Sequence, residues 1–203
     1  SFLVQRWGDL NPLEMEEEIK GLFKQLKEVK VDKKCDAFVG MGEVVKKWMV
    51  FCPLVGELRD KAMRTRHWSQ LMDLCGKNVT VTNDITLRDM WNMELHKSPE
   101  AVEEITDQAK QEAKMEVTLG KLQNNWKDVE FSFDAHKGTE VLLSKMNDED
   151  FEMLEENQLA VQNMFASRFL STFEKECLYW QKSLANVNEV SQLLGEVQRS
   201  WAF

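Results

Sequence analysis

The sequence contains no run of about 18 apolar residues, the length that a membrane-spanning helix needs. Its start, Ser1 to Trp7, lacks the basic-then-apolar layout of a signal peptide. We therefore expect a soluble, intracellular protein with no membrane partner. Basic residues are fewer than acidic ones, 26 against 35, and the formal net charge is -9. A nucleic-acid partner is disfavoured, because neutralising phosphates requires a basic face.

The four cysteines, Cys35, Cys52, Cys75 and Cys177, lie far apart and form no Cys-x-x-Cys pair. This spacing provides neither a zinc ribbon nor a dithiol redox motif, so we expect reduced, packed thiols. The stretch Asn78-Val79-Thr80 matches the acceptor pattern of N-linked glycosylation. Nothing else in the sequence suggests secretion, and we expect this short pattern to be unused.

Patterns for catalysis, phosphate binding and metal binding are missing as well. The Gly-Lys pairs at 76–77 and 120–121 are followed by Asn and Leu, whereas a phosphate loop requires Ser or Thr there. The acidic run 147–150 lacks the glycine and the distal Glu of a calcium loop. The three histidines are tens of residues apart, and we expect His67 to bond a group of a neighbouring helix. We predict no catalytic, metal-binding or cofactor-binding residue.

Prolines and glycines number only three and nine, and they fall between strongly periodic segments, which is typical of helices. Asn11 and Pro12 form a helix start, and apolar residues then recur at spacings of three and four up to Val29. Asp36 is expected to cap a second helix that ends at Pro53. We expect these two helices to pair as an antiparallel hairpin.

Further helices follow the Pro53 break. A short one is predicted from Arg66 to Cys75, closed by Gly76 as a left-handed C-cap. The stretch 86–89 has the pattern of a capping box, and Ser98-Pro99-Glu100 opens a longer helix with an apolar stripe that reaches Trp126.

The hydrophobic period changes after Trp126. Apolar residues alternate with polar ones from Val129 to Phe133, which predicts a β-hairpin that turns at 134–139 and returns through 141–143. Helical spacing resumes after Asn147, which is expected to be an N-cap, and a separate last helix is predicted from Val190 to Trp201. This pattern runs to the end without a stop signal, so we expect a chain cut from a longer one.

The sequence therefore predicts a mainly all-α fold of elongated antiparallel helical bundles with one small β-hairpin. We divide it into a first helical bundle (1–127), the hairpin insertion (128–143) and a second helical part (144–203) that is truncated at its C-terminus. Seven Trp, 11 Phe and 11 Met are expected mainly in the core. Trp7 and Trp201 are the best candidates for contacts with further chain, although a core position is favoured for each.

Several segments resemble, in order, the linker region of dynein heavy chains, which lies N-terminal to the ring of AAA+ modules. The stretch Arg64-Thr65-Arg66-His67-Trp68-Ser69-Gln70-Leu71-Met72 looks like the R-x-R-H-W-x-x-L pattern of that family. Trp180-Gln181-Lys182 is similar to axonemal members, and Glu196-Val197-Gln198-Arg199-Ser200-Trp201 resembles a later segment, with Ser200 where the family commonly has Thr. The family-signature structural residues are Arg64, Arg66, His67, Trp68, Trp180, Glu196, Gln198, Arg199 and Trp201.

The resemblance implies a non-catalytic mechanical linker in an axonemal motor heavy chain. Such a segment has no cofactor of its own, because ATP and Mg²⁺ bind in the ring of the parent chain. The partners implied are the AAA+ ring of the same heavy chain and, through other parts of the parent chain, dynein intermediate and light chains and microtubules. The implied location is the cytoplasm and cytoskeleton, in the axoneme of a cilium or flagellum.

Two other classes of protein stay open at this stage. The apolar stripes alone would permit a static spectrin-like helical scaffold or interaction module. That class predicts an internal repeat with Trp residues in matching positions, and the sequence has none that we can find. A helical enzyme would require clustered titratable groups with perturbed pKa values, which a sequence does not reveal.

Overall fold

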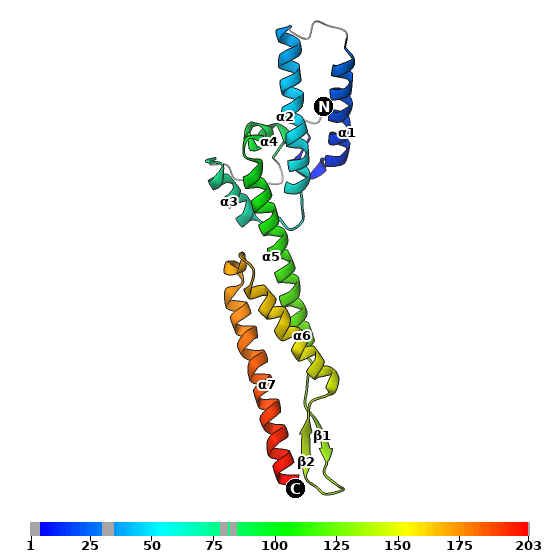
Figure 1. The fold of residues 1–203 in the computed structure, drawn as a ribbon, viewed down its shortest axis with the longest axis vertical. Helices are drawn as coiled ribbons and strands as arrows, with labels where there is room; N and C mark the ends of the chain where they lie inside the picture. The colour runs from blue at the N-terminus through cyan, green and yellow to red at the C-terminus, as the bar shows by residue number, and fades with distance from the viewer. Residues whose placement is uncertain (1–4, 30–34, 78–80, 82–84, 203) are drawn as a thin grey trace. The chain divides into compact units, whose positions relative to one another are not determined.

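The computed structural model describes residues 5–29, 35–77, 81 and 85–202 (Figure 1). The glycosylation pattern at 78–80 lies outside the described residues. The chain divides into two compact units, Ser1–Lys110 and Gln111–Phe203, and the boundary falls inside a helix, α5 (Pro99–Trp126). The predicted division into a first helical bundle (1–127), a hairpin insertion (128–143) and a second helical part (144–203) stays a prediction.

The first unit begins with a 3-10 turn, η2 (Trp7–Asp9), followed by α1 (Pro12–Glu28) and α2 (Asp36–Leu58). The helices α1 and α2 pack side by side in opposite directions (Figure 1), which agrees with the predicted hairpin. Then come α3 (Thr65–Leu74), α4 (Leu87–Asn92), the 3-10 turn η3 (Leu95–Lys97) and the first part of α5.

Local sequence explains most of these helix starts. The Asn11 side chain accepts a hydrogen bond from the Glu14 N–H at 3.5 Å, and Pro12 occupies the first turn of α1. In α4 the predicted capping box is present: the Thr86 N–H donates to Asp89 at 3.0 Å, and the Asp89 N–H donates to Thr86 at 3.3 Å.

Two predictions about α2 are wrong. The N-cap is Cys35, and Asp36 is the first helical residue, where its carboxylate still suits the positive end of the helix dipole. The helix also continues through Pro53 to Leu58. Proline in a helix interior removes one backbone hydrogen bond, at a cost of about 3 kcal/mol. The turn after Pro53 buries Leu54, Val55 and Leu58, and this apolar burial offsets that cost.

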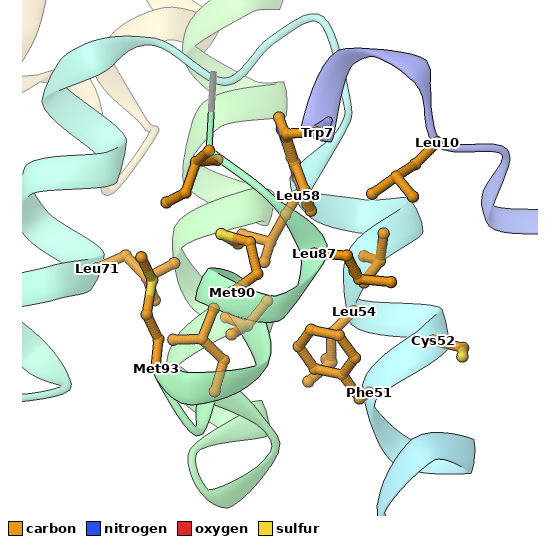
Figure 2. Packing of buried hydrophobic residues seen from close by; sticks show 14 of the residues in the cluster. Trp7, Leu10, Phe51, Cys52, Leu54, Leu58, Leu71, Leu87, Met90 and Met93 are labelled. Atoms are coloured by element: carbon orange, nitrogen blue, oxygen red, sulfur yellow. The ribbon is translucent and has the colours of Figure 1, made fainter. Parts of the chain in front are cut away.

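The core of the first unit collects side chains from η2, α1, α2, α3, α4, η3 and α5. Figure 2 shows part of it, with labelled residues from η2, α2, α3 and α4. Its centre consists of apolar side chains that are fully or almost fully buried, among them Phe51, Leu58, Leu71, Leu87, Met90 and Leu95. The helices α3 and α4 have only ten and six residues, which is too short for a helix to be stable alone. Packing into this core therefore holds them in place.

The second unit contains the remainder of α5, the strands β1 (Ser132–Ala135) and β2 (Leu142–Lys145), α6 (Asp148–Phe165), the 3-10 turn η4 (Leu170–Thr172) and α7 (Glu174–Ala202). The strands form an antiparallel hairpin in which Phe133 faces Ser144 and Ala135 faces Leu142. Asn147 is the N-cap of α6, as predicted. The second core lies between α5, α6 and α7 around Met115, Leu122, Leu154, Val161, Cys177 and Leu184.

The predicted fold class, mainly α-helical with one small β-hairpin, is confirmed. Two details differ. Val129 and Phe131 precede β1 rather than belong to it, and the predicted separate last helix is part of the 29-residue α7. The sequence between 184 and 194 contains no proline, and its one inward polar residue, Ser191, is buried against Met146, so nothing interrupts the helix there.

Candidate functional site

The first signature segment, residues 64–72, forms the N-terminal end of α3. The backbone N–H of Arg64, the N-cap residue, donates a hydrogen bond to Nδ1 of His67 at 3.0 Å. The His67 N–H donates in turn to the Arg64 carbonyl at 3.0 Å. His67 is fully buried, so its ring fills the core while it satisfies a backbone donor. This bond lies within its own helix start, and the expected bond to a group of a neighbouring helix stays a prediction.

The next residues of this segment pack inward. The ring of Trp68 meets that of Trp7 edge to face, with centroids 5.9 Å apart, and Leu71 and Met72 are buried in the first core. Trp7 is itself buried, which supports the core position favoured for it. The side chains of Arg64 and Arg66 are exposed. In this segment, therefore, His67 caps the helix, Leu71 and Met72 pack in the core, and the two arginines are exposed.

The other end of α3 closes with a Schellman motif. The Lys77 N–H donates to the Met72 carbonyl at 2.8 Å, and the Gly76 N–H donates to the Asp73 carbonyl at 3.1 Å. Gly76 adopts a φ of +63°, the left-handed conformation predicted for it.

The last signature segment, residues 196–201, lies in α7 and contacts the β-hairpin. Oε1 of Gln198 accepts a hydrogen bond from the Ser144 N–H at 2.6 Å, and Nε2 of Gln198 donates to the Ser144 carbonyl at 3.0 Å. Farther along the helix the Trp201 ring meets His136 of the hairpin turn edge to face at 5.5 Å. Trp201 is nevertheless 56% exposed, so the core position favoured for it is wrong.

The remaining signature residues, Trp180, Glu196 and Arg199, belong to α7 in the second unit and are half-buried or exposed. Glu196 and Arg199 are exposed, and Nε of Arg199 donates to the Gly195 carbonyl of its own helix at 3.2 Å. Trp180 is half-buried against the second core and meets the Tyr179 ring edge to face at 5.6 Å. Among the signature residues, then, Trp68 and Gln198 join separate elements within their units, whereas Glu196 and Arg199 lie exposed on α7.

Sequence reasoning missed an aromatic stack in the first unit. The rings of Trp48 and Trp91 are nearly parallel with centroids 4.2 Å apart, and the His96 ring also stacks on Trp91, with centroids 5.0 Å apart. Burial lowers the pKa of His96 below its ordinary value, and Glu94 opposes this shift. The three residues come from α2, α4 and η3, so no short motif could have revealed the stack.

Titratable groups are otherwise dispersed. Among the residues that the structure describes, no three His, Cys, Asp or Glu side chains are grouped so that they could hold a metal ion. The carboxylate of Glu112 is fully buried and accepts a hydrogen bond from the Thr172 hydroxyl at 3.2 Å. Within the same described ranges, no helix is both long and apolar enough to cross a membrane.

Comparison with known proteins identifies the family. Residues 2–203 match the family described as dynein heavy chain, N-terminal region 2. The chain is 44% identical to the dynein alpha chain of the flagellar outer arm of Chlamydomonas reinhardtii, over 97% of its own length and 4% of that protein. It is 35% identical to dynein axonemal heavy chain 17 of Mus musculus (97% and 4%) and 35% identical to dynein axonemal heavy chain 9 of Homo sapiens (96% and 4%).

The chain thus belongs to the N-terminal region of the dynein heavy chains, and the resemblance read from its signature segments is confirmed. It spans about 4% of the length of these relatives, whose names place them among axonemal and flagellar heavy chains.

Proposed function

We propose that this chain is a non-catalytic, force-transmitting linker segment of an axonemal dynein heavy chain. In this function it carries a conformational change, driven by ATP hydrolysis in the AAA+ ring of the parent chain, into microtubule-based movement of a cilium or flagellum. The observation that supports the proposal most directly is the match to the N-terminal region of dynein heavy chains over residues 2–203.

The internal structure of each unit suits such a function. The signature residues satisfy backbone groups at element ends, as His67 does at α3 and Gln198 at β2. A part that transmits force must keep its elements from fraying, and capped helix ends with buried apolar seams achieve this. The same residues have no arrangement that suggests turnover of a substrate, and we propose that ATP and Mg²⁺ are bound by the ring alone.

The partners and location follow from the proposed function. The ring of the same heavy chain is the immediate mechanical partner, and other parts of the parent chain bind the intermediate and light chains and the microtubule. The whole motor then works in the cytoskeleton of the axoneme.

The test measures a distance in the parent heavy chain as its nucleotide state changes. One dye is attached at Gln70, an exposed residue of α3, and the second is attached to the ring, after replacement of the exposed Cys35 by Ser. A linker that moves predicts a nucleotide-dependent change of tens of ångströms. A constant distance in every nucleotide state would favour a static scaffold.

Two controls make the result specific. A dye pair at Gln70 and Glu100, both exposed and within the first unit, is expected to keep its distance in all states. The isolated 203-residue chain is expected to show no ATP binding by titration calorimetry. Micromolar ATP affinity in that chain would contradict the non-catalytic assignment.

A further inference from the structure

A cavity of about 340 Å³ lies within the second unit, between the segment that connects α5 to β1 and the first half of α7. This volume is within the range of small-molecule and side-chain binding pockets. The residues that matter here are four aromatic ones and one acidic one: Trp126, Phe131, Tyr179, Trp180 and Glu130.

The polar groups of the cavity are few. Nε1 of Trp126 is buried and has no hydrogen-bond partner among the described residues. A buried indole N–H usually finds an acceptor, but this nitrogen has essentially no exposed surface, so it does not open into the cavity. Ser183 and Glu130 also line the cavity, and Glu130 is an exposed residue.

Aromatic rings beside a carboxylate favour an organic cation. The face of an aromatic ring is electronegative and attracts ammonium groups, most strongly when several rings surround them. Tyr179 and Trp180 stand nearly perpendicular, with an interplanar angle of 76°, so they can form two adjoining walls. Residues 111–203 carry 16 acidic and nine basic side chains, and this net charge of -7 attracts a basic partner.

The apolar part of the lining narrows the choice of cation. Met146, Leu184 and Val187 offer hydrocarbon surface, which suits a side chain with a long aliphatic stem. A guanidinium has five N–H donors in a fixed fork, and the few acceptors of this cavity would leave several of them unpaired. The three donors of a lysine ammonium are easier to satisfy with one carboxylate, a hydroxyl and ring faces.

We propose that this cavity binds a lysine side chain of a partner protein. The stem lies against the apolar lining, and the ammonium lies between the aromatic rings and Glu130. The net charge of -7 on residues 111–203 favours a basic protein segment, which carries further positive charges, over a free small amine, so a lysine within such a segment is the occupant. The proposal does not depend on the mechanical function above.

The test uses the 203-residue chain and two peptide-like probes of nearly equal size, N-acetyl-lysine methylamide and N-acetyl-norleucine methylamide. The indole N–H resonances of Trp126 and Trp180 are followed by NMR during titration. The lysine probe is expected to shift both resonances saturably, with a dissociation constant at least about fivefold lower than that of the norleucine probe, because only lysine carries the charge. Equal affinities, or no saturable shift with lysine, would overturn the proposal.

Variants separate the carboxylate and aromatic contributions. Glu130→Gln and Tyr179→Leu change exposed residues, so the fold is retained, and each is expected to weaken the lysine probe several-fold. Glu140→Gln, which changes an exposed carboxylate next to the hairpin turn, is the matched control and should leave the affinity unchanged. Equal affinity in Glu130→Gln and Glu140→Gln would also overturn the proposal.

Discussion

The side-chain amide of Gln198 pairs with both backbone groups of Ser144, accepting from its N–H at 2.6 Å and donating to its carbonyl at 3.0 Å. In the hairpin, Ser144 faces Phe133 in a non-hydrogen-bonded pair, so its backbone groups point away from β1. The pair His136–Val141, three positions nearer the turn, is hydrogen-bonded from the His136 N–H to the Val141 carbonyl at 2.9 Å, and the two kinds of pair alternate along the hairpin. Gln198 therefore occupies the outer edge of β2 as a neighbouring strand would. An exposed strand edge is otherwise open to unwanted pairing.

Replacement of Gln198 by Ala should release the hairpin from α7. Both hydrogen bonds are lost, and at about 0.5–1.5 kcal/mol each the second unit is expected to lose about 1–3 kcal/mol of stability. Hydrogen exchange measured by NMR is the direct test, since the Ser144 amide should exchange much faster in Gln198→Ala.

The matched control is Gln192→Ala, six residues earlier in α7. The Gln192 side chain is exposed and donates to Asn188 of the same helix at 3.2 Å, so its loss should leave exchange at Ser144 unchanged. Unaltered protection of Ser144 in Gln198→Ala would mean that the hairpin is held by other contacts.

Replacement of Pro53 by Ala should stabilise the first unit. The new N–H can donate to the carbonyl of Met49, and helix α2 already continues on both sides of this position. Proline also restricts the unfolded chain, which reduces the benefit, and we expect a net gain of about 1–2 kcal/mol. Slower hydrogen exchange of the buried amides of α2 would show this gain in stability.

Pro99→Ala is the control for this effect. Pro99 is exposed and is the first residue of α5, where its missing N–H costs no helical hydrogen bond, so the stability should change little. A loss of stability in Pro53→Ala would show that the ring of Pro53 packs in a way that its exposed position does not suggest.

The contrast between Pro53 and Gly76 shows how far local sequence predicts this fold. Gly76, the capping box at Thr86 and the start of α5 at Pro99 were predictable because each depends on residues within one turn. The prediction that α2 ends at Pro53 was wrong because the effect of this proline depends on residues distant in sequence. Whether a helix survives a proline depends on what the following turn buries, and Leu54, Val55 and Leu58 pack against residues distant in sequence.

The contacts of the signature residues depend on the same kind of long-range information. The helical period places Gln198 on α7, but its partner Ser144 is 54 positions away, and no pattern in the sequence links the two. His67 could be identified as noteworthy from its neighbours, and its bond to Arg64 is local enough to be found from a capping argument. The resemblance to the family identified these residues without explaining them.

Cys52 is expected to resist alkylation in the folded protein. Burial, with a smaller contribution from the charge of Glu16, raises the pKa of its thiol to about 11. The reactive thiolate is then about one molecule in a thousand at pH 8, and its fraction increases as the pH rises toward 11. Mass spectrometry after iodoacetamide treatment should find Cys35, which is exposed, modified long before Cys52.

Denatured protein provides the control for the cysteine experiment, since all four thiols should then react at similar rates. Labelling of folded Cys52 as fast as Cys35 would contradict its burial in the first core.

Two glycines in open space should respond to alanine in opposite ways. A Cβ at Gly76 or at Gly40 would have no neighbouring atom within 4 Å, so packing does not distinguish them. Gly76 has a φ of +63°, and Gly76→Ala should cost about 1–2 kcal/mol because the left-handed region is strained for alanine. Gly40 lies inside α2, and Gly40→Ala should stabilise the same unit by about 0.5–1 kcal/mol. Hydrogen exchange of the shared core would measure both, and a destabilising Gly40→Ala would mean that this face of α2 is covered in solution.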